Sequence, residues 1–313
     1  MDGWLKAVEW NTVAMLITRS YTQLSPYHHY QALLILNTVS KDLQYWFWQN
    51  NLLLNPEKSE VIYLGTRQRR CDLPSKTCVA GCDITSSDTV KTLGVTLDST
   101  LSFQTHDNNV VRSCNFHLCA LRHIRRSLHC NIANTIACCI VGSKLDYCNS
   151  LLFNIPTSTL QKLQRVQNNL ARVVCDVSKF QQPSEDLLHE LHWLPIRQWI
   201  HYKIAIITYR SLHLQQPSYI SSLLVNNIPP WTLRSTSQGL LNTPCSQTVI
   251  GARRFSSAAP VIWNKLSYTV RSAVTIGTFH TRLKTHLFPV IASYTYAIPL
   301  LIHLFVKLAI NIR

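Results

Sequence analysis

The stretch Lys91–Arg126, KTLGVTLDSTLSFQTHDNNVVRSCNFHLCALRHIRR, changes its pattern partway along. Its first eight residues, Lys91–Asp98, alternate between apolar and polar positions and are rich in β-branched side chains, which predicts strand structure. From Thr105 onward the apolar residues recur every three or four positions, which predicts a helix. The apolar face of that helix consists of Val111, Cys114, Leu118, Leu121 and Leu128. A sheet therefore ends and a helical region begins here, and the sequence predicts an α+β fold.

The sequence before this stretch predicts one helix and a few short strands. Asn55-Pro56 ends the helix, because proline cannot continue it. The runs Val61–Gly65, Thr77–Gly81 and Cys82–Ile84 are typical of strands around a turn at Gly81. We therefore expect a helix laid on a small antiparallel sheet. Its helix spans residues 30–50, where the apolar residues at helical spacing are Leu33, Leu36, Val39, Leu43 and Phe47.

Two further helices are predicted before residue 176. The first carries Ile132, Ile136 and Ile140 at four-residue spacing, so these isoleucines are expected to face the core. The second opens after Pro156, with Thr157 or Ser158 as the expected N-cap. Its apolar face consists of Leu160, Leu163, Val166, Leu170 and Val173.

The C-terminal part of the sequence also predicts helices. Two are expected at about residues 185–191 and 196–213. A looser region rich in Ser, Thr and Pro follows over 226–247, and a final helix, TFHTRLKTHLF, begins at Thr278. One face of this last helix carries Phe279, Leu283 and Leu287.

The charge of the chain is unevenly distributed. The formal net charge is +15; residues 1–190 carry 18 Lys and Arg against 15 Asp and Glu, whereas residues 191–313 carry 12 Lys and Arg and no carboxylate. The C-terminal part therefore cannot supply carboxylates for acid–base or metal chemistry. Its excess positive charge favours a polyanion such as nucleic acid as the partner, and a basic surface that is merely solvated is the alternative.

Cysteine usage and the chain ends indicate where the protein resides. The eleven cysteines are an odd number without a disulfide-framework spacing, and the N-terminus lacks the pattern of a secretory signal. We therefore expect an intracellular protein, nuclear or cytoplasmic and not secreted. The apolar tail 289–313 is interrupted by Pro299, His303 and Lys307, so a membrane span is not expected.

Motifs that could indicate a metal or nucleotide site do not meet their geometric requirements. In HELH, His189 and His192 are three residues apart, whereas the helical zinc motif needs histidines four apart. Cys71, Cys78 and Cys82 do not form paired CxxC motifs. We expect no metal site, and phosphate-binding glycine loops are not found either.

A series of distinctive words nevertheless runs through the chain in a fixed order. TQL at Thr22 precedes the helix over residues 30–50, and the words continue to residue 288. Together they resemble the closing part of the reverse transcriptase of non-LTR (LINE, jockey and chicken-repeat type) retrotransposons and the region that follows it. The words are WFWQNNLLLNPEKSEVIYLG from Trp46, KTLGVTLDSTLSF from Lys91, SKLDYCNSLL from Ser143, LQKLQRVQNNLARVV from Leu160, LHELHWLPIRQWIHYKI from Leu188, GARRFSSAAPVIWNKL from Gly251 and FHTRLKTHLF from Phe279.

The resemblance implies a division of the chain. Residues 1–101 would be an incomplete reverse-transcriptase palm, with a helix on a small antiparallel sheet. Residues 102–178 would be a helical thumb, and 179–288 a mostly helical, basic C-terminal region; the apolar tail 289–313 is not covered.

The resemblance also implies that the polymerase site is lost. Family members place Tyr-Ala-Asp-Asp before the word TQL, and its two aspartates help to hold the Mg²⁺ ions that the intact family needs. Here the matching aspartate positions hold Ser20 and Tyr21, after Arg19. No cofactor is therefore expected. Lys58 matches a lysine thought to protonate the leaving pyrophosphate, and without metals we interpret it as a surface lysine.

Two hypotheses for the function follow. The chain is either an inactive RNA-directed DNA polymerase fragment or a non-catalytic basic module that binds DNA or an RNA–DNA hybrid. The tryptophans of the C-terminal region (Trp193, Trp199, Trp231 and Trp263) are expected to fill the core, with base stacking as the alternative. The residues expected to contact nucleic acid are Leu93, Gly94, Arg112, Arg122, Arg125, Arg126, Lys162, Arg165, Arg172, Arg253 and Arg254.

Overall fold

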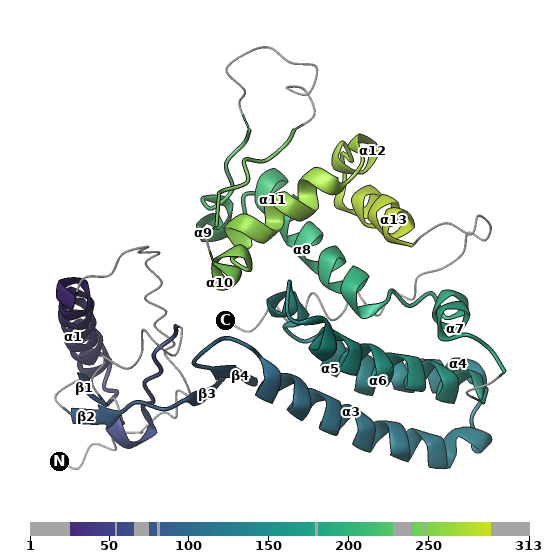
Figure 1. Cartoon of the computed structure of the whole chain (residues 1–313), viewed down its shortest axis with the longest axis horizontal. Coiled ribbons are helices and arrows are strands. Elements are labelled where there is room, and N and C mark those ends of the chain that lie inside the picture. Colours follow the sequence, from purple (N-terminus) through teal and green to yellow (C-terminus); the bar gives the residue numbers. More distant parts are fainter. Residues whose placement is uncertain are drawn as a thin grey trace.

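A computed structural model describes residues 26–53, 55–65, 75–79, 82–178, 181–227, 239–246 and 248–288 (Figure 1). The described fold is rich in helices and contains two small antiparallel sheets, which confirms the general α+β prediction. We refer to residues 26–92 as the N-terminal region and to residues 93–288 as the helical region.

The N-terminal region consists of a helix and short strands. Helix α1 (Pro26–Gln49) confirms the helix predicted over residues 30–50, and a 3₁₀ turn follows at Pro56–Lys58 (η1). Strands β1 (Lys76–Val79) and β2 (Cys82–Thr85) form an antiparallel pair in which Lys76 faces Thr85. Helix α1 packs on β1, as expected for a helix on a small sheet.

The predicted strand Val61–Gly65 is not a strand. Val61 makes one isolated bridge with Ser86, and Gly65 N–H donates to the Ser99 carbonyl. Ile62 to Leu64 are irregular. The prediction was wrong because a strand needs successive ladder bonds, and Val61 contributes an isolated bridge instead of a ladder.

The motif KTLGVTLD forms a β-hairpin. Strands β3 (Thr89–Thr92) and β4 (Val95–Asp98) pair antiparallel in a two-stranded sheet separate from β1–β2. Leu93 and Gly94 form its two-residue turn, and both have positive φ angles of 46° and 79°. Such a turn matches the twist of the flanking strands and requires left-handed backbone at both positions.

Three helical segments form a bundle after this hairpin. Helix α3 (Gln104–Ile124) is followed by α4 (Cys130–Ala137), a π-helical turn (η3, Cys138–Gly142) and α5 (Ser143–Asp146), and then by α6 (Thr157–Cys175). Contacts join the two N-terminal ends of α3 and α6 and also their two C-terminal ends, so these helices run parallel. Short 3₁₀ turns occur at Arg125–Ser127 (η2) and Asn149–Leu152 (η4).

The structure corrects two details of this bundle. Ile132 and Ile140 are exposed and Ile136 is half-buried, whereas Ala133 and Ala137 are fully buried. The small alanines allow α4 to approach its neighbours closely, which branched isoleucines at those positions would prevent. At the start of α6, Pro156 is the N-cap residue, and neither Thr157 nor Ser158 caps the helix with its side chain.

Several of the remaining helices pack around α8. The elements are α7 (Ser184–Glu190), α8 (Ile196–His213), α9 (Ser218–Ser221), α10 (Val249–Ala252), α11 (Phe255–Lys265), α12 (Tyr268–Arg271) and α13 (Ile276–Leu287). Helices α7, α8 and α13 confirm the predicted ones. Helix α8 has buried residues all around its circumference and contacts α6, α9, α11 and α13, which makes it the central helix.

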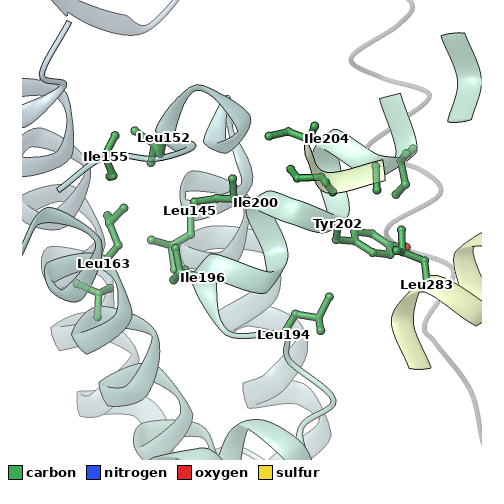
Figure 2. Close-up of a cluster of buried hydrophobic side chains, with 14 of the residues drawn as sticks. Leu145, Leu152, Ile155, Leu163, Leu194, Ile196, Ile200, Tyr202, Ile204 and Leu283 are labelled. Carbon is green, nitrogen blue, oxygen red and sulfur yellow. The ribbon is translucent and has the colours of Figure 1, made fainter. Parts of the chain in front are cut away.

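One hydrophobic core joins most of these helices, whereas α7 packs on α6 in a smaller cluster of Ala171, Leu187 and Leu188. The large core extends in sequence from Val95 to Leu283 and so crosses the expected boundary at residues 178/179 without a break. Figure 2 shows its central part, where Leu145 and Leu163 face Ile196 and Ile200 of α8, and Tyr202 lies near Leu283 of α13. Within the described residues, this cluster includes no side chain that precedes Val95.

Candidate nucleic-acid interface

The turn between β4 and α3 is held by one carboxylate. Asp98 accepts hydrogen bonds from Thr100 Oγ1 (2.6 Å), Phe103 N–H (2.7 Å) and Ser102 N–H (2.8 Å). Burial alone would raise the pKa of Asp98, but these hydrogen bonds outweigh it and hold the pKa below its usual value. The sequence analysis missed this residue, although an aspartate before Ser and Thr is a common turn-forming pattern.

The β3–β4 turn is fastened to the helical bundle. Tyr147, which follows α5, donates its phenolic hydrogen to the Leu93 carbonyl. A Cβ atom on Gly94 would lie 3.4 Å from the Tyr147 ring, which is ordinary van der Waals contact, so the positive φ is what favours glycine here. Leu93 itself points outward with 75% of its surface exposed. Leu93 and Gly94, which were both predicted to contact nucleic acid, are thus exposed at the tip of a hairpin that Tyr147 holds in place.

The solvent-facing side of α3 is basic. Arg112, Arg122 and, in the following turn, Arg126 are all exposed, and the side chains between them on this side include Phe116 and His123. The interval from Arg112 to Arg126 is about 21 Å at 1.5 Å per residue. The single carboxylate of α3, Asp107, is fully buried. We call the exposed residues Arg112, Phe116, Arg122, His123 and Arg126 the α3 face. This face combines three guanidinium groups and carries no carboxylate.

Two residues of α6 extend this surface. Lys162 Nζ donates to Asn108 Oδ1 of α3 at 3.0 Å, which joins the two helices near their N-termini. Arg165 lies one turn further along α6 and is exposed. The carboxylates close to the opposite end of α6, namely Asp176, Glu185, Asp186 and Glu190, belong to its C-cap and to α7.

Three of the predicted contact residues instead hold the fold together. Arg125 donates to the carbonyls of Val173 and Val174, both at 3.0 Å, at the C-terminal end of α6. Arg172 Nη2 donates to Ser184 Oγ at the start of α7. These guanidinium groups are half-buried and already bonded, so they are poorly placed to reach a phosphate.

Arg253 is the third of these residues. Its Nη1 donates to the Leu101 carbonyl at 2.7 Å and its Nε to the Asn154 carbonyl at 3.2 Å, which ties the end of α10 to the β4–α3 turn. Burial lowers the pKa of Arg253, and the charge of Asp98 partly offsets this effect. The neighbouring Arg254 is exposed and bonds the Gly251 carbonyl within its own turn.

Asp107 is a buried acid that the sequence analysis did not single out. Its side chain is 0% exposed, and neither carboxylate oxygen has a hydrogen-bond partner within the described residues. Burial raises the pKa of Asp107 to about 7; Lys162 acts in the lowering direction and Asp98 in the raising direction. No periodicity could have identified it, because a polar residue at a core position looks like an ordinary break in the apolar pattern.

The described tryptophans of the C-terminal region, Trp193, Trp199 and Trp263, belong to the core or lie against it. Trp263 is 2% exposed, and its Nε1 donates to the Gly239 carbonyl at 2.9 Å. Trp193 and Trp199 are partly buried and pack on the same core. Core filling is therefore confirmed for Trp263, and Trp231 lies outside the described residues.

The HELH segment does not present its histidines together. Helix α7 ends at Glu190, and His192 lies beyond it with a φ of 56°, so the two histidines do not share a helix face. Across the described ranges, there is no group of three or more His, Cys, Asp or Glu side chains that could hold a metal ion.

Two of the positions that the family resemblance singles out, Ser20 and Tyr21, lie outside the described residues. Lys58 ends η1 and is exposed. In the part of the chain that the structure describes, no helix is long and apolar enough to cross a lipid bilayer, and the tail 289–313 lies outside that part.

Comparisons with known proteins do not assign this chain to a family: no protein-family model, no curated protein and no solved structure matches it.

Proposed function

We propose that this chain is a catalytically inactive relative of non-LTR retrotransposon reverse transcriptases, and that it binds nucleic acid by contacting the phosphates of the nucleic-acid backbone. In this proposal residues 1–101 correspond to an incomplete palm, 102–178 to the thumb and 179–288 to the basic C-terminal region. The ordered sequence words support the lineage, and the β3–β4 hairpin followed by a helical bundle is compatible with it. Because nucleic acid is found inside the cell, this proposal implies that the protein acts in the nucleus or the cytoplasm.

The loss of polymerase activity follows from the side chains at the family's metal positions. Ser20 and Tyr21 offer hydroxyl groups where two aspartates would be needed, and an arginine beside them repels a divalent cation. We therefore expect the chain to incorporate no nucleotide on a primed RNA template in the presence of Mg²⁺. Measurable extension of a labelled primer would contradict this part of the proposal.

The α3 face is the observation that supports binding. Arginine side chains recognise phosphates through charge-assisted hydrogen bonds, and three of them stand on this face without a neighbouring carboxylate on the same helix. The described hydrogen bonds occupy Arg125, Arg172 and Arg253, and leave the α3 face directed to solvent. Contacts of this kind position a nucleic acid without recognising its sequence.

Binding is tested by fluorescence anisotropy with the full chain. A labelled DNA duplex and an RNA–DNA hybrid of equal length are titrated at several salt concentrations. The triple variant Arg112→Gln, Arg122→Gln and Arg126→Gln should reduce the slope of log K against log[salt] by about 3, because each neutralised phosphate contributes a slope of about −0.9. Affinity should fall alike for unrelated sequences.

A second triple variant removes the same charge elsewhere. Lys91→Gln, Arg197→Gln and Lys265→Gln change exposed residues of β3, α8 and α11. This control should retain nearly the wild-type slope. Equal losses in both variants would mean that the net charge alone attracts the polyanion, and the α3 face would then have no special role.

A further inference from the structure

The α3 face carries one large apolar side chain in its middle. Phe116 is 72% exposed, although the helix has a buried side formed by Cys114, Leu118 and Leu121. At 100° per residue, Phe116 points about 160° away from Leu118, so the core cannot reach it. Its ring meets that of the neighbouring His117 edge-on, with 5.3 Å between the ring centroids. Figure 1 shows α3 along the outer edge of the helical region.

The surroundings of Phe116 are cationic. Arg112 lies one turn before it on the same side of the helix, and Arg122 lies about 9 Å further along the axis and about 120° around it, at 1.5 Å and 100° per residue. An exposed aromatic ring between guanidinium groups is the combination with which proteins bind single strands, since the cations hold the phosphates and the ring stacks on a base. A duplex offers the same phosphates, but its base faces are already stacked.

We propose that the α3 face binds single-stranded nucleic acid, with Phe116 stacking on an unpaired base between backbone contacts to Arg112 and Arg122. This inference rests on the proposed function and adds the form of the ligand. The occupant follows from charge complementarity, because guanidinium groups precede and follow the ring along the helix axis and α3 exposes no carboxylate. An apolar protein partner would have to desolvate these charges.

The test compares a labelled 20-nucleotide oligo(dT) with a 20-base-pair duplex on the full-length protein at one salt concentration. Phe116→Ala should weaken oligo(dT) binding by about 5- to 100-fold, the range expected for one stacked base, and should change duplex binding by less than about twofold. Phe116→Trp should retain or strengthen oligo(dT) binding. Phe116→Leu, which keeps apolar surface without an aromatic face, should behave like alanine.

Tyr219→Ala is the matched control. Tyr219, on α9, is 71% exposed, nearly as much as Phe116, but it lies outside the α3 face. Its removal should leave both affinities unchanged, and thermal melts of all variants should coincide because both side chains are exposed. If Phe116→Ala leaves oligo(dT) binding intact, or weakens both ligands equally, stacking by Phe116 is refuted while backbone binding stands. If the wild type binds neither oligonucleotide, the proposed function fails together with this inference.

Discussion

The N-terminal region and the helical region differ in how they bury their apolar side chains. In the helical region, buried residues of most of its helices, α3 to α13, meet in one core that is centred on α8. In the N-terminal region the last turns of α1 carry Tyr45, Trp46 and Trp48, and each of these rings is more than half exposed. Regular elements thus occur in both described regions, whereas the large shared core is found where the elements fit one another.

The largest expected difference between the two regions lies in amide hydrogen exchange. Amides of α6 and α8 can exchange only through opening of the shared core, whereas the end of α1 has little buried surface to lose. We expect protection factors in α6 and α8 to exceed those of Tyr45–Gln49 by about 1,000-fold or more. Exchange followed by mass spectrometry on the full chain measures this, and equal protection in both places would contradict the comparison.

Removal of one aromatic ring from each region should show the same contrast in free energy. Phe279 is 0% exposed and stacks on Tyr209, with ring centroids 4.3 Å apart, so Phe279→Ala should lower the free energy of unfolding by about 3–5 kcal/mol. Trp46→Ala removes a larger side chain that is 54% exposed and should cost less than about 1 kcal/mol. Urea unfolding monitored by circular dichroism measures both, and similar losses would show that α1 has a core of its own.

The sequence predicts elements better than it predicts which of their faces are buried. The apolar spacing correctly identified α1, α3, α6, α8 and α13, because long amphipathic patterns determine helices locally. It failed for α4, where Ile132 and Ile140 point outward and two alanines form the contact. Small residues give no hydrophobic signal, although they decide how closely two helices can approach.

The candidate site was predictable as a charge pattern but not as a surface. Arg112, Arg125 and Arg172 look equivalent in the sequence, since each is a basic residue beside an apolar stripe. The structure separates them: Arg112 is exposed, whereas Arg125 and Arg172 bond neighbouring elements. Those partners lie 48 and 12 residues away in the chain, respectively, so periodicity within one helix could not reveal them.

The buried acid Asp107 should make the stability of the helical region depend on pH. Its folded-state pKa of about 7 lies above the ordinary value of 3.8 for an aspartate, so folding favours the protonated form. The contribution of Asp107 to stability is therefore fully present below about pH 4 and is lost as pH rises through 7. Between pH 4 and 8 we expect a decrease of about 2–4 kcal/mol from this residue, since one pKa unit corresponds to about 1.4 kcal/mol.

Asp107→Asn should remove most of this decrease, because the amide stays neutral at every pH tested. Urea unfolding at half-unit pH intervals measures the slope for both proteins. Asp83→Asn, which changes an exposed carboxylate of β2, is the matched control and should keep the wild-type slope. A slope that survives in Asp107→Asn would assign the pH dependence to another group.

The consecutive residues Arg125 and Arg126 should differ in what they contribute. Substitution of Arg125 should affect the free energy of unfolding, and substitution of Arg126 should affect binding; these are the smallest effects that we predict. Arg125 donates to three carbonyls, those of Val173, Val174 and Leu128, and places its charge at the C-terminal end of α6, where the helix dipole favours a cation. Arg125→Ala should therefore lower the free energy of unfolding by about 1.5–3 kcal/mol. Arg126 is exposed, and Arg126→Ala should change the free energy of unfolding by less than about 0.5 kcal/mol.

In duplex binding, Arg126→Ala should have a larger effect than Arg125→Ala. Arg126→Ala removes one phosphate contact of the α3 face and should reduce the salt slope by about 1, whereas Arg125→Ala should leave that slope unchanged at a temperature where both variants are folded. Chemical denaturation and a salt series on the same two proteins provide both measurements. If Arg125→Ala loses binding while its stability is intact, the interface lies on the opposite side of this turn. The α3 face would then not be the binding surface.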